Sequence, residues 1–111
     1  MKLIMAITIL AAVSPLAISN YMDGNSLKRI CTSDVSRETI QCYGYVAGAI
    51  DQLNLMVDVG DGVPFHCPPE QMALGQAKSV VEKYLKDHPE ELHKPASSIV
   101  IFAMSKSFPC Q

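Results

Sequence analysis

Four cysteines, Cys31, Cys42, Cys67 and Cys110, constrain what this chain can fold into more than any other feature. Cys110 is the last residue but one of 111, where chain ends normally fray, so a crosslink there would tie the end down. No CxxC or HxxxH spacing supports a metal site. An even number of cysteines in a short exported chain is typical of disulfides. We therefore predict two disulfides, no bound metal and no cofactor.

The first residues predict export. A short basic start is followed by an apolar run over residues 3–13, a helix-breaking Ser14-Pro15 pair and small residues up to Ser19. This pattern is typical of a secretory signal peptide. The apolar run is much shorter than the ~20 residues that a membrane-spanning helix needs. We predict a cleaved signal peptide over residues 1–19 and a single domain over residues 20–111.

Hydrophobic periodicity predicts an all-α fold, a small disulfide-stapled domain of four to five helices. The clearest segment is residues 70–86, where apolar residues recur at helical spacing after Pro68-Pro69. Further helices are expected at about residues 25–31, with Asp23 or Asn25 as N-cap, and over residues 37–57. A fourth helix is expected to begin near Pro95.

Two stripes mark the long segment 37–57. One is expected to face the core and contains Ile40, Tyr43, Ala47, Ile50 and Leu53. The other contains Gly44 and Gly48, one turn apart, and small residues of this kind are expected to let another helix approach closely.

The last helix is apolar on every side over residues 99–104. A helix of this kind must be buried on both sides. One small domain is unable to enclose it fully, so we predict a homodimer that covers part of Ile101, Phe102 and Met104.

Helix order suggests how the cysteines pair. Cys67 precedes the third helix and Cys110 follows the fourth, and the short link 87–94 predicts that these helices are antiparallel neighbours. That arrangement favours a Cys67–Cys110 bridge and leaves Cys31 for Cys42. Spacing alone leaves the two other pairings open.

No catalytic constellation is visible in the sequence. His66 adjoins Cys67, but adjacent side chains rarely point at each other and the predicted disulfide uses that sulfur. There is no GxSxG elbow and no glycine-rich phosphate loop. With 9 basic and 11 acidic residues and no basic stripe, the chain is not expected to bind nucleic acid.

Two loops remain as candidate binding sites, because binding residues concentrate on loops held by a rigid scaffold. The first is residues 58–66, the longest irregular stretch, and its candidate contacts are Asp58, Asp61, Val63, Phe65 and His66. The rival is the link 87–94, with Glu90, Glu91 and His93. We favour the first loop because it carries acids and is anchored at its end by Cys67.

An ordered set of short motifs runs through the chain. They are CYGYVAG at 42–48, Cys-x-Pro at 67–69, LGQ at 74–76, YL at 84–85, HPE at 88–90, Pro-Ala at 95–96 and FPC at 108–110. Together they resemble the Rap/Tai immunity proteins of type VI secretion systems. The resemblance covers most of residues 20–111 and is weakest before residue 39.

This resemblance implies a small helical periplasmic protein, commonly a homodimer, that is not an enzyme. It also implies a protein partner, a peptidoglycan amidase toxin whose Cys–His active-site groove the immunity protein would block. The alternative is a periplasmic acid-stress chaperone of the HdeA type, since three histidines and 11 acidic residues would respond to acid. The chain lacks the tryptophan-containing pattern of those chaperones.

Overall fold

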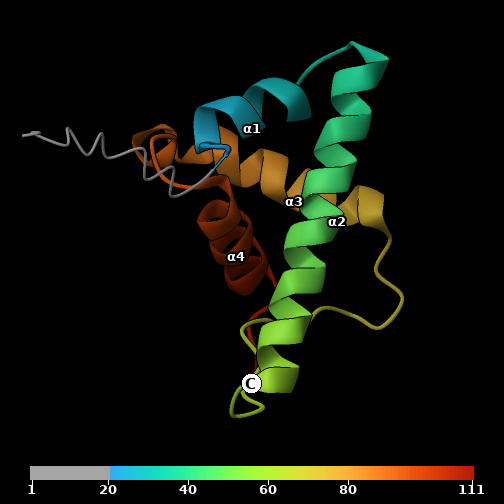
Figure 1. Cartoon of the computed structure of the whole chain (residues 1–111), viewed down its shortest axis with the longest axis vertical. Helices are drawn as coiled ribbons and strands as arrows, with labels where there is room; N and C mark the ends of the chain where they lie inside the picture. The colour runs from blue at the N-terminus through green and yellow to red at the C-terminus, as the bar shows by residue number, and fades with distance from the viewer. Residues whose placement is uncertain (1–20) are drawn as a thin grey trace, which may run out of the picture.

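The computed structural model describes residues 21–111, which form four α-helices and one 3-10 turn (Figure 1). In chain order these are α1 (Gly24–Cys31), α2 (Ser36–Val59), α3 (Leu74–Asp87), the 3-10 turn (Pro89–Glu91) and α4 (Ala96–Ser107). The prediction of a small all-α fold is confirmed. The predicted signal peptide lies outside the described residues, and among those described no helix is long and apolar enough to cross a membrane.

α1 begins at a side-chain cap and is tied to the start of α4. The Asp23 carboxylate accepts a hydrogen bond from the Ser26 backbone N–H at 2.8 Å, as expected of an N-cap. Gly24 N–H donates to the Lys94 carbonyl and Ala96 N–H donates to the Met22 carbonyl, both at 3.0 Å. These two bonds hold α1 beside the chain that enters α4.

All four helices contribute to one core. Its fully buried members are Leu27, Ile30 and Cys31 of α1, Cys42 and Val46 of α2, Ala77, Val81 and Leu85 of α3, and Ala96, Ile99, Val100, Ala103 and Met104 of α4. Each set recurs at helical spacing, so each helix presents one apolar face to the others.

The predicted core stripe of α2 is correct at Leu53, which is 1% exposed, and wrong at Ile40, where the helix begins. Ile40 is 69% exposed, whereas Cys42 and Val46 are buried. The Cys31–Cys42 disulfide explains the difference, because it turns Cys42 toward α1 and fixes the face that follows it. Gly44 and Gly48 face open space, because no heavy atom of residues 21–111 lies within 4 Å of the position that a Cβ would take at either glycine. The expected close approach of another helix is therefore not seen among the described residues.

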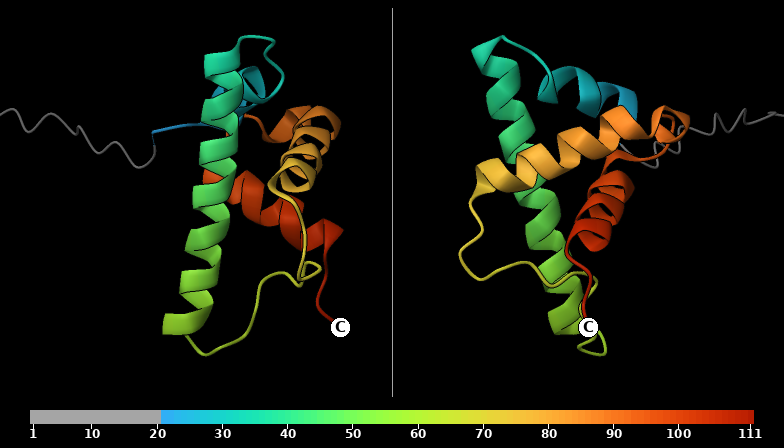
Figure 2. Two further views of the ribbon diagram at one scale, coloured as in Figure 1. Left: turned by 90° about the vertical axis from the view of Figure 1, so that its right-hand side faces the viewer. Right: turned by 180° about the vertical axis from the view of Figure 1, so that it is seen from behind.

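Both disulfides pair as predicted, Cys31 with Cys42 and Cys67 with Cys110, and each has a Cα–Cα distance of 5.0 Å. The reason given for the second pair is wrong. In Figures 1 and 2, α4 runs at a steep angle to α3 instead of back alongside it. The bond forms because the loop after α2 carries Cys67 to the C-terminal segment well before α3 begins.

Two helix boundaries differ from the prediction in ways that affect the candidate site. α2 continues to Val59, so Asp58 lies on its last turn and not on a loop. α3 begins only at Leu74, four residues later than predicted. Residues 68–73 instead form a turn in which Met72 N–H donates to the Pro69 carbonyl at 3.1 Å.

Candidate functional site

The lower end of α2 stands apart from the helical core. Its last turns extend past the other helices, with only the following loop and the C-terminal segment beside them (Figures 1 and 2). We call residues 55–65, which comprise these turns and the first part of the loop, the tip. It contains most of the loop that the sequence favoured as a binding site.

Exposed apolar side chains gather on the tip. It holds five of the ten large hydrophobic residues that are exposed in residues 21–111: Leu55, Met56, Val59, Val63 and Phe65. Val59 is the most open of them, at 76% exposed. Scattered single exposed hydrophobics are ordinary, but a cluster in adjacent turns is typical of an interaction site. Leu55 and Met56 were not among the predicted contacts, because apolar residues inside a helical segment are expected to face the core.

The tip carries two acids on a turn of defined shape. Asp58 and Asp61 are both exposed. The Asp61 carboxylate accepts a weak hydrogen bond from Val63 N–H at 3.4 Å. Gly62 between them has φ +78°, a conformation that favours glycine because it has no Cβ. The turn reverses the chain and leaves Val63 and Phe65 facing solvent.

The far end of this loop is anchored three times. The Cys67–Cys110 disulfide joins it to the C-terminal segment, and Cys67 N–H donates to the Phe108 carbonyl at 2.8 Å. The third anchor is the His66 side chain, which is only 5% exposed and so holds this end of the loop against the rest of the protein. The prediction that His66 contacts a partner is therefore corrected: its side chain holds the loop and offers no surface.

His66 has an unusual environment. Its Nδ1 atom is buried and has no hydrogen-bond partner in the described part of the chain. Burial lowers the His66 pKa, because a charged imidazolium loses its hydration in this position. The neutral imidazole is therefore favoured over the charged form at this position.

The rival loop, residues 87–94, lies at the opposite end of the molecule from the tip (Figures 1 and 2). Glu90 and His93 are exposed, so they are available to a partner. Glu91 is already engaged: it accepts hydrogen bonds from the Tyr84 hydroxyl at 2.5 Å and from Lys94 Nζ at 3.0 Å. The hydrogen bond from Tyr84 is the larger cause of a lowered Glu91 pKa, and the bond from Lys94 is the next. Burial is the main cause that raises the pKa of Tyr84 to about 12, and the hydrogen bond to Glu91 is the next. The two loops are too far apart to form one small site.

The sequence model of the Rap1a immunity proteins matches residues 23–110, which contain all four helices, both loops and all four cysteines. The chain belongs to the Rap1a immunity protein family. It is therefore an immunity protein, one that acts against a secreted toxin. It matches no curated protein and no solved structure at a significant level.

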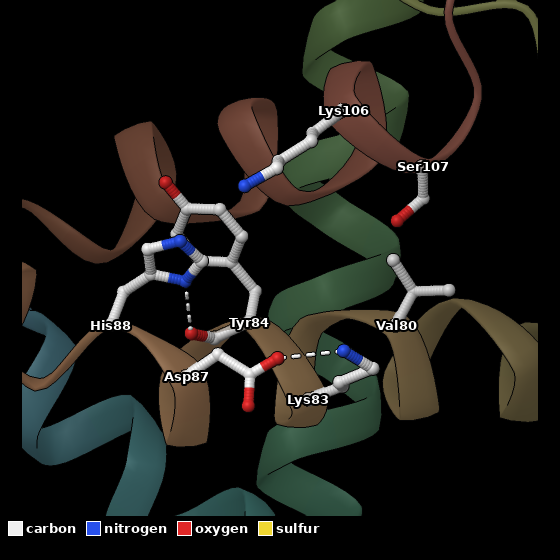
Figure 3. A pocket seen from close by; sticks show the side chains of 7 residues that line it. All are labelled: Val80, Lys83, Tyr84, Asp87, His88, Lys106 and Ser107. Atoms are coloured by element: carbon white, nitrogen blue, oxygen red, sulfur yellow. Dashed lines mark hydrogen bonds and ion pairs between the residues drawn. The ribbon is translucent and has the colours of Figure 1, made fainter.

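A pocket of about 250 Å³ lies where α3 and α4 end in this Rap1a protein (Figure 3). The Tyr84 and His88 rings stack along one side with centroids 3.9 Å apart, and His88 Nδ1 lies 2.9 Å from the Tyr84 carbonyl. Lys83 pairs with Asp87 at 2.6 Å, and Lys106 reaches in from α4. Lys106 lies in the last turn of α4, where a positive charge is favourable. This arrangement stabilises the fold and has no evident chemistry of its own.

A second pocket of about 270 Å³ lies between α2 and the entrance to α3. It is lined by Ala47, Ile50, Asp51, Met72, Leu74 and Ala77. Leu74 is 40% exposed at its rim.

In residues 21–111 of this immunity protein, no group of three His, Cys, Asp or Glu side chains is arranged to hold a metal ion.

The predicted dimer residues are not equivalent in the Rap1a chain. Phe102 is 48% exposed and Ile101 is half-buried, so both have surface to offer. Met104 is fully buried within the single chain. Met104 is therefore a core residue, and its prediction as a dimer contact is corrected. The reason is that α4 buries a wider face against the other three helices than the sequence indicated.

Proposed function

We propose that this immunity protein binds a peptidoglycan amidase toxin delivered by type VI secretion and occludes its active-site groove with the tip. Membership of the Rap1a family supports a protein inhibitor that performs no reaction itself. The observation that selects the tip is the exposed apolar cluster on the end of α2 and on the loop after it, a loop that a disulfide and a buried histidine anchor. A loop anchored in this way loses little conformational freedom on binding.

The tip suits a groove in two respects. Phe65 is an exposed aromatic side chain next to the anchored end of the loop, and aromatic residues at the centre of an interface carry much of the binding energy. The carboxylates of Asp58 and Asp61 are acceptors for a hydrogen bond from the imidazole of a Cys–His amidase. Such a contact would occupy the group that the toxin needs for proton transfer.

The test is inhibition of peptidoglycan hydrolysis by purified type VI amidases in the presence of the purified protein. We expect one amidase to be inhibited at a one-to-one ratio. Phe65→Ala should weaken that binding by about thirtyfold in titration calorimetry. A combined Glu90→Ala and His93→Ala variant should bind as the wild type does. If only this last variant loses affinity, the rival loop is the inhibitory element; if no amidase binds, the proposed target is wrong.

The proposal includes a periplasmic location, since peptidoglycan lies there and the first residues have the pattern of a signal peptide. Fractionation of cells followed by mass measurement of the mature protein tests this. The expected mass corresponds to cleavage near Ser19. Full-length protein in the cytoplasmic fraction would contradict it.

We also propose that the protein is a homodimer in which α4 of each copy covers Phe102 and Ile101 of the other. Phe102→Glu should then shift the sedimentation coefficient toward that of a monomer while the helical circular dichroism stays unchanged. Phe102 replaces Met104 as the position to test because Met104 is in the core. A monomeric wild-type protein at high micromolar concentration would refute the dimer.

The second candidate is the acid-stress chaperone, because the buried Nδ1 atom of His66 has no hydrogen-bond partner among residues 21–111. Acid would charge this side chain and weaken its burial. The discriminating measurement is protection of an aggregating client protein at about pH 2. Protection without inhibition of any amidase would favour the chaperone.

A further inference from the structure

Charge is distributed unevenly along this chain. Between Arg37 and Lys78 there is no lysine or arginine, although that interval contains five acidic residues. One of them, Glu38, pairs with Arg29 at 2.6 Å. The other four are Asp51, Asp58, Asp61 and Glu70, and none forms an ion pair within residues 21–111. The lower part of α2 and the loop after it are therefore acidic without compensation from their own segment.

α2 differs from the other helices at its C-terminal end. α1, α3 and α4 each have basic residues in the last turn, where a positive charge is favourable. α2 has none, and it carries Asp58 there instead. A carboxylate beside unpaired helix carbonyls is locally unfavourable. Side chains that break a local rule of this kind are expected at functional sites.

Acids and exposed apolar side chains alternate along the tip. Asp58 lies between Met56 and Val59, and Asp61 precedes Val63 by two residues. The tip is thus an apolar patch with a negative border. Complementary potentials guide association and suppress wrong partners.

We propose that the tip docks into an apolar cleft of its protein partner that is bordered by lysine and arginine side chains. This proposal rests on the proposed function, since it names the chemistry of the toxin surface that the tip would occupy. It extends the docking surface from the loop to Leu55, Met56 and Val59 of α2. A second copy of the chain fits less well, because pairing two tips would bring acids against acids. An anionic membrane surface would repel the same charges.

The experiment uses the full mature protein and two kinds of probe. The first is the amidase that the wild-type protein inhibits. The second is independent of any toxin: a synthetic peptide of Lys, Leu and Phe, compared with a peptide of the same length in which Glu replaces every Lys. Binding is measured by calorimetry and by surface-immobilised kinetics at low and high salt.

Two variant pairs separate the apolar part from the acidic part. Val59→Glu removes apolar surface at the tip, and its control is Val35→Glu, an exposed valine before α2 at the other end of that helix. A double variant, Asp58→Lys with Asp61→Lys, reverses the border, and its control is Asp34→Lys, an exposed acid near the start of α2. All these positions are exposed, so the variants are expected to fold, and circular dichroism checks this.

We expect the Lys peptide to bind at least about tenfold more tightly than the Glu peptide, with the preference lost on charge reversal. Val59→Glu should weaken amidase binding by about tenfold or more, and the double reversal should also remove the dependence of the association rate on salt. Both controls should match the wild type. Equal binding of the two peptides overturns the proposal even if no amidase is inhibited. If an amidase is inhibited but binds the tip variants as tightly as it binds the wild type, the proposed function stands and this inference is wrong. Loss of a dimer in the tip variants would assign the surface to a second copy and would likewise overturn it.

Discussion

Replacing Gly24 by alanine tests how tightly α1 is held against the chain that enters α4. A Cβ at this position would lie 2.8 Å from both the Cα and the carbonyl oxygen of Leu92, and closer still to Cδ1 of Ile99. The Ile99 side chain is fully buried and has little room to move. The Leu92 carbonyl accepts hydrogen bonds from Asn25 N–H at 2.9 Å and from the Asn25 side chain at 3.1 Å.

An alanine at position 24 therefore either strains the packing around Ile99 or displaces Leu92, which would break the hydrogen bonds to its carbonyl. Overpacking of a well-packed site typically costs 1–3 kcal/mol, and each lost hydrogen bond costs about 1 kcal/mol. We expect Gly24→Ala to lower the free energy of unfolding by about 3 kcal/mol. In a domain of this size that corresponds to a fall in Tm of roughly 12–24 °C.

Gly48→Ala is the matched control, because nothing lies within 4 Å of its Cβ position in the middle of α2. Alanine is favoured over glycine in a helix interior by about 1 kcal/mol, so this variant should be more stable than the wild type. Chemical denaturation at several protein concentrations measures both changes. If Gly24→Ala unfolds within 0.5 kcal/mol of the wild type (about the size of ordinary surface effects), the close approach is wrong. A destabilised Gly48→Ala would show that another chain covers this face.

Three further predictions concern the tip and its anchors. Burial lowers the pKa of His66 in the folded protein, so its contribution to the free energy of unfolding is full above the unfolded pKa of about 6.5 and falls as the pH drops below that value. Denaturation between pH 7.5 and pH 5 should show this decrease in the wild type. The decrease should disappear in His66→Gln and remain in the control His93→Gln. Cys67 and Cys110 are exposed whereas Cys31 and Cys42 are buried, so a reductant should open the Cys67–Cys110 bond first, as measured by alkylation and peptide mass. Reduction of the buried pair first would refute this order. Replacing Cys67 and Cys110 by serine should lower the free energy of unfolding by about 4 kcal/mol, because the bond joins residues 43 apart in sequence. Asp58→Asn removes a charge from the carbonyl end of α2 and should raise the unfolding free energy by about 0.5 kcal/mol while weakening toxin binding; a loss of stability would contradict the helix-end reasoning.

Local chemistry explains why much of the fold was predictable. Asp23 caps α1, and the apolar residues of α3 recur at the helical spacing that buries Ala77, Val81 and Leu85. Each of these signals depends on neighbours within a few residues of one another. The disulfide pairing was also predicted correctly, although the antiparallel packing of α3 and α4 from which the Cys67–Cys110 pair was inferred is wrong (Figure 1).

The face that α2 presents to the core was not predictable from its own residues. α2 is apolar on several sides, and the stripe with Ile40 is as regular as the stripe with Cys42 and Val46. Only contact with α1, α3 and α4 distinguishes them. The same holds for Met104 of α4, whose burial depends on three helices distant in sequence.

The sequence by itself determined the helical segments and the family, because helix caps, apolar spacing and motif order are local properties of the chain. Tertiary structure alone decided which apolar residues remain outside. Helices that meet at steep angles bury one face in the middle of α2 and leave its C-terminal end beyond the core (Figure 1). The tip is exposed for that reason: Leu55, Met56 and Val59 have the apolar side chains of core residues, and no other helix in residues 21–111 reaches far enough to cover them.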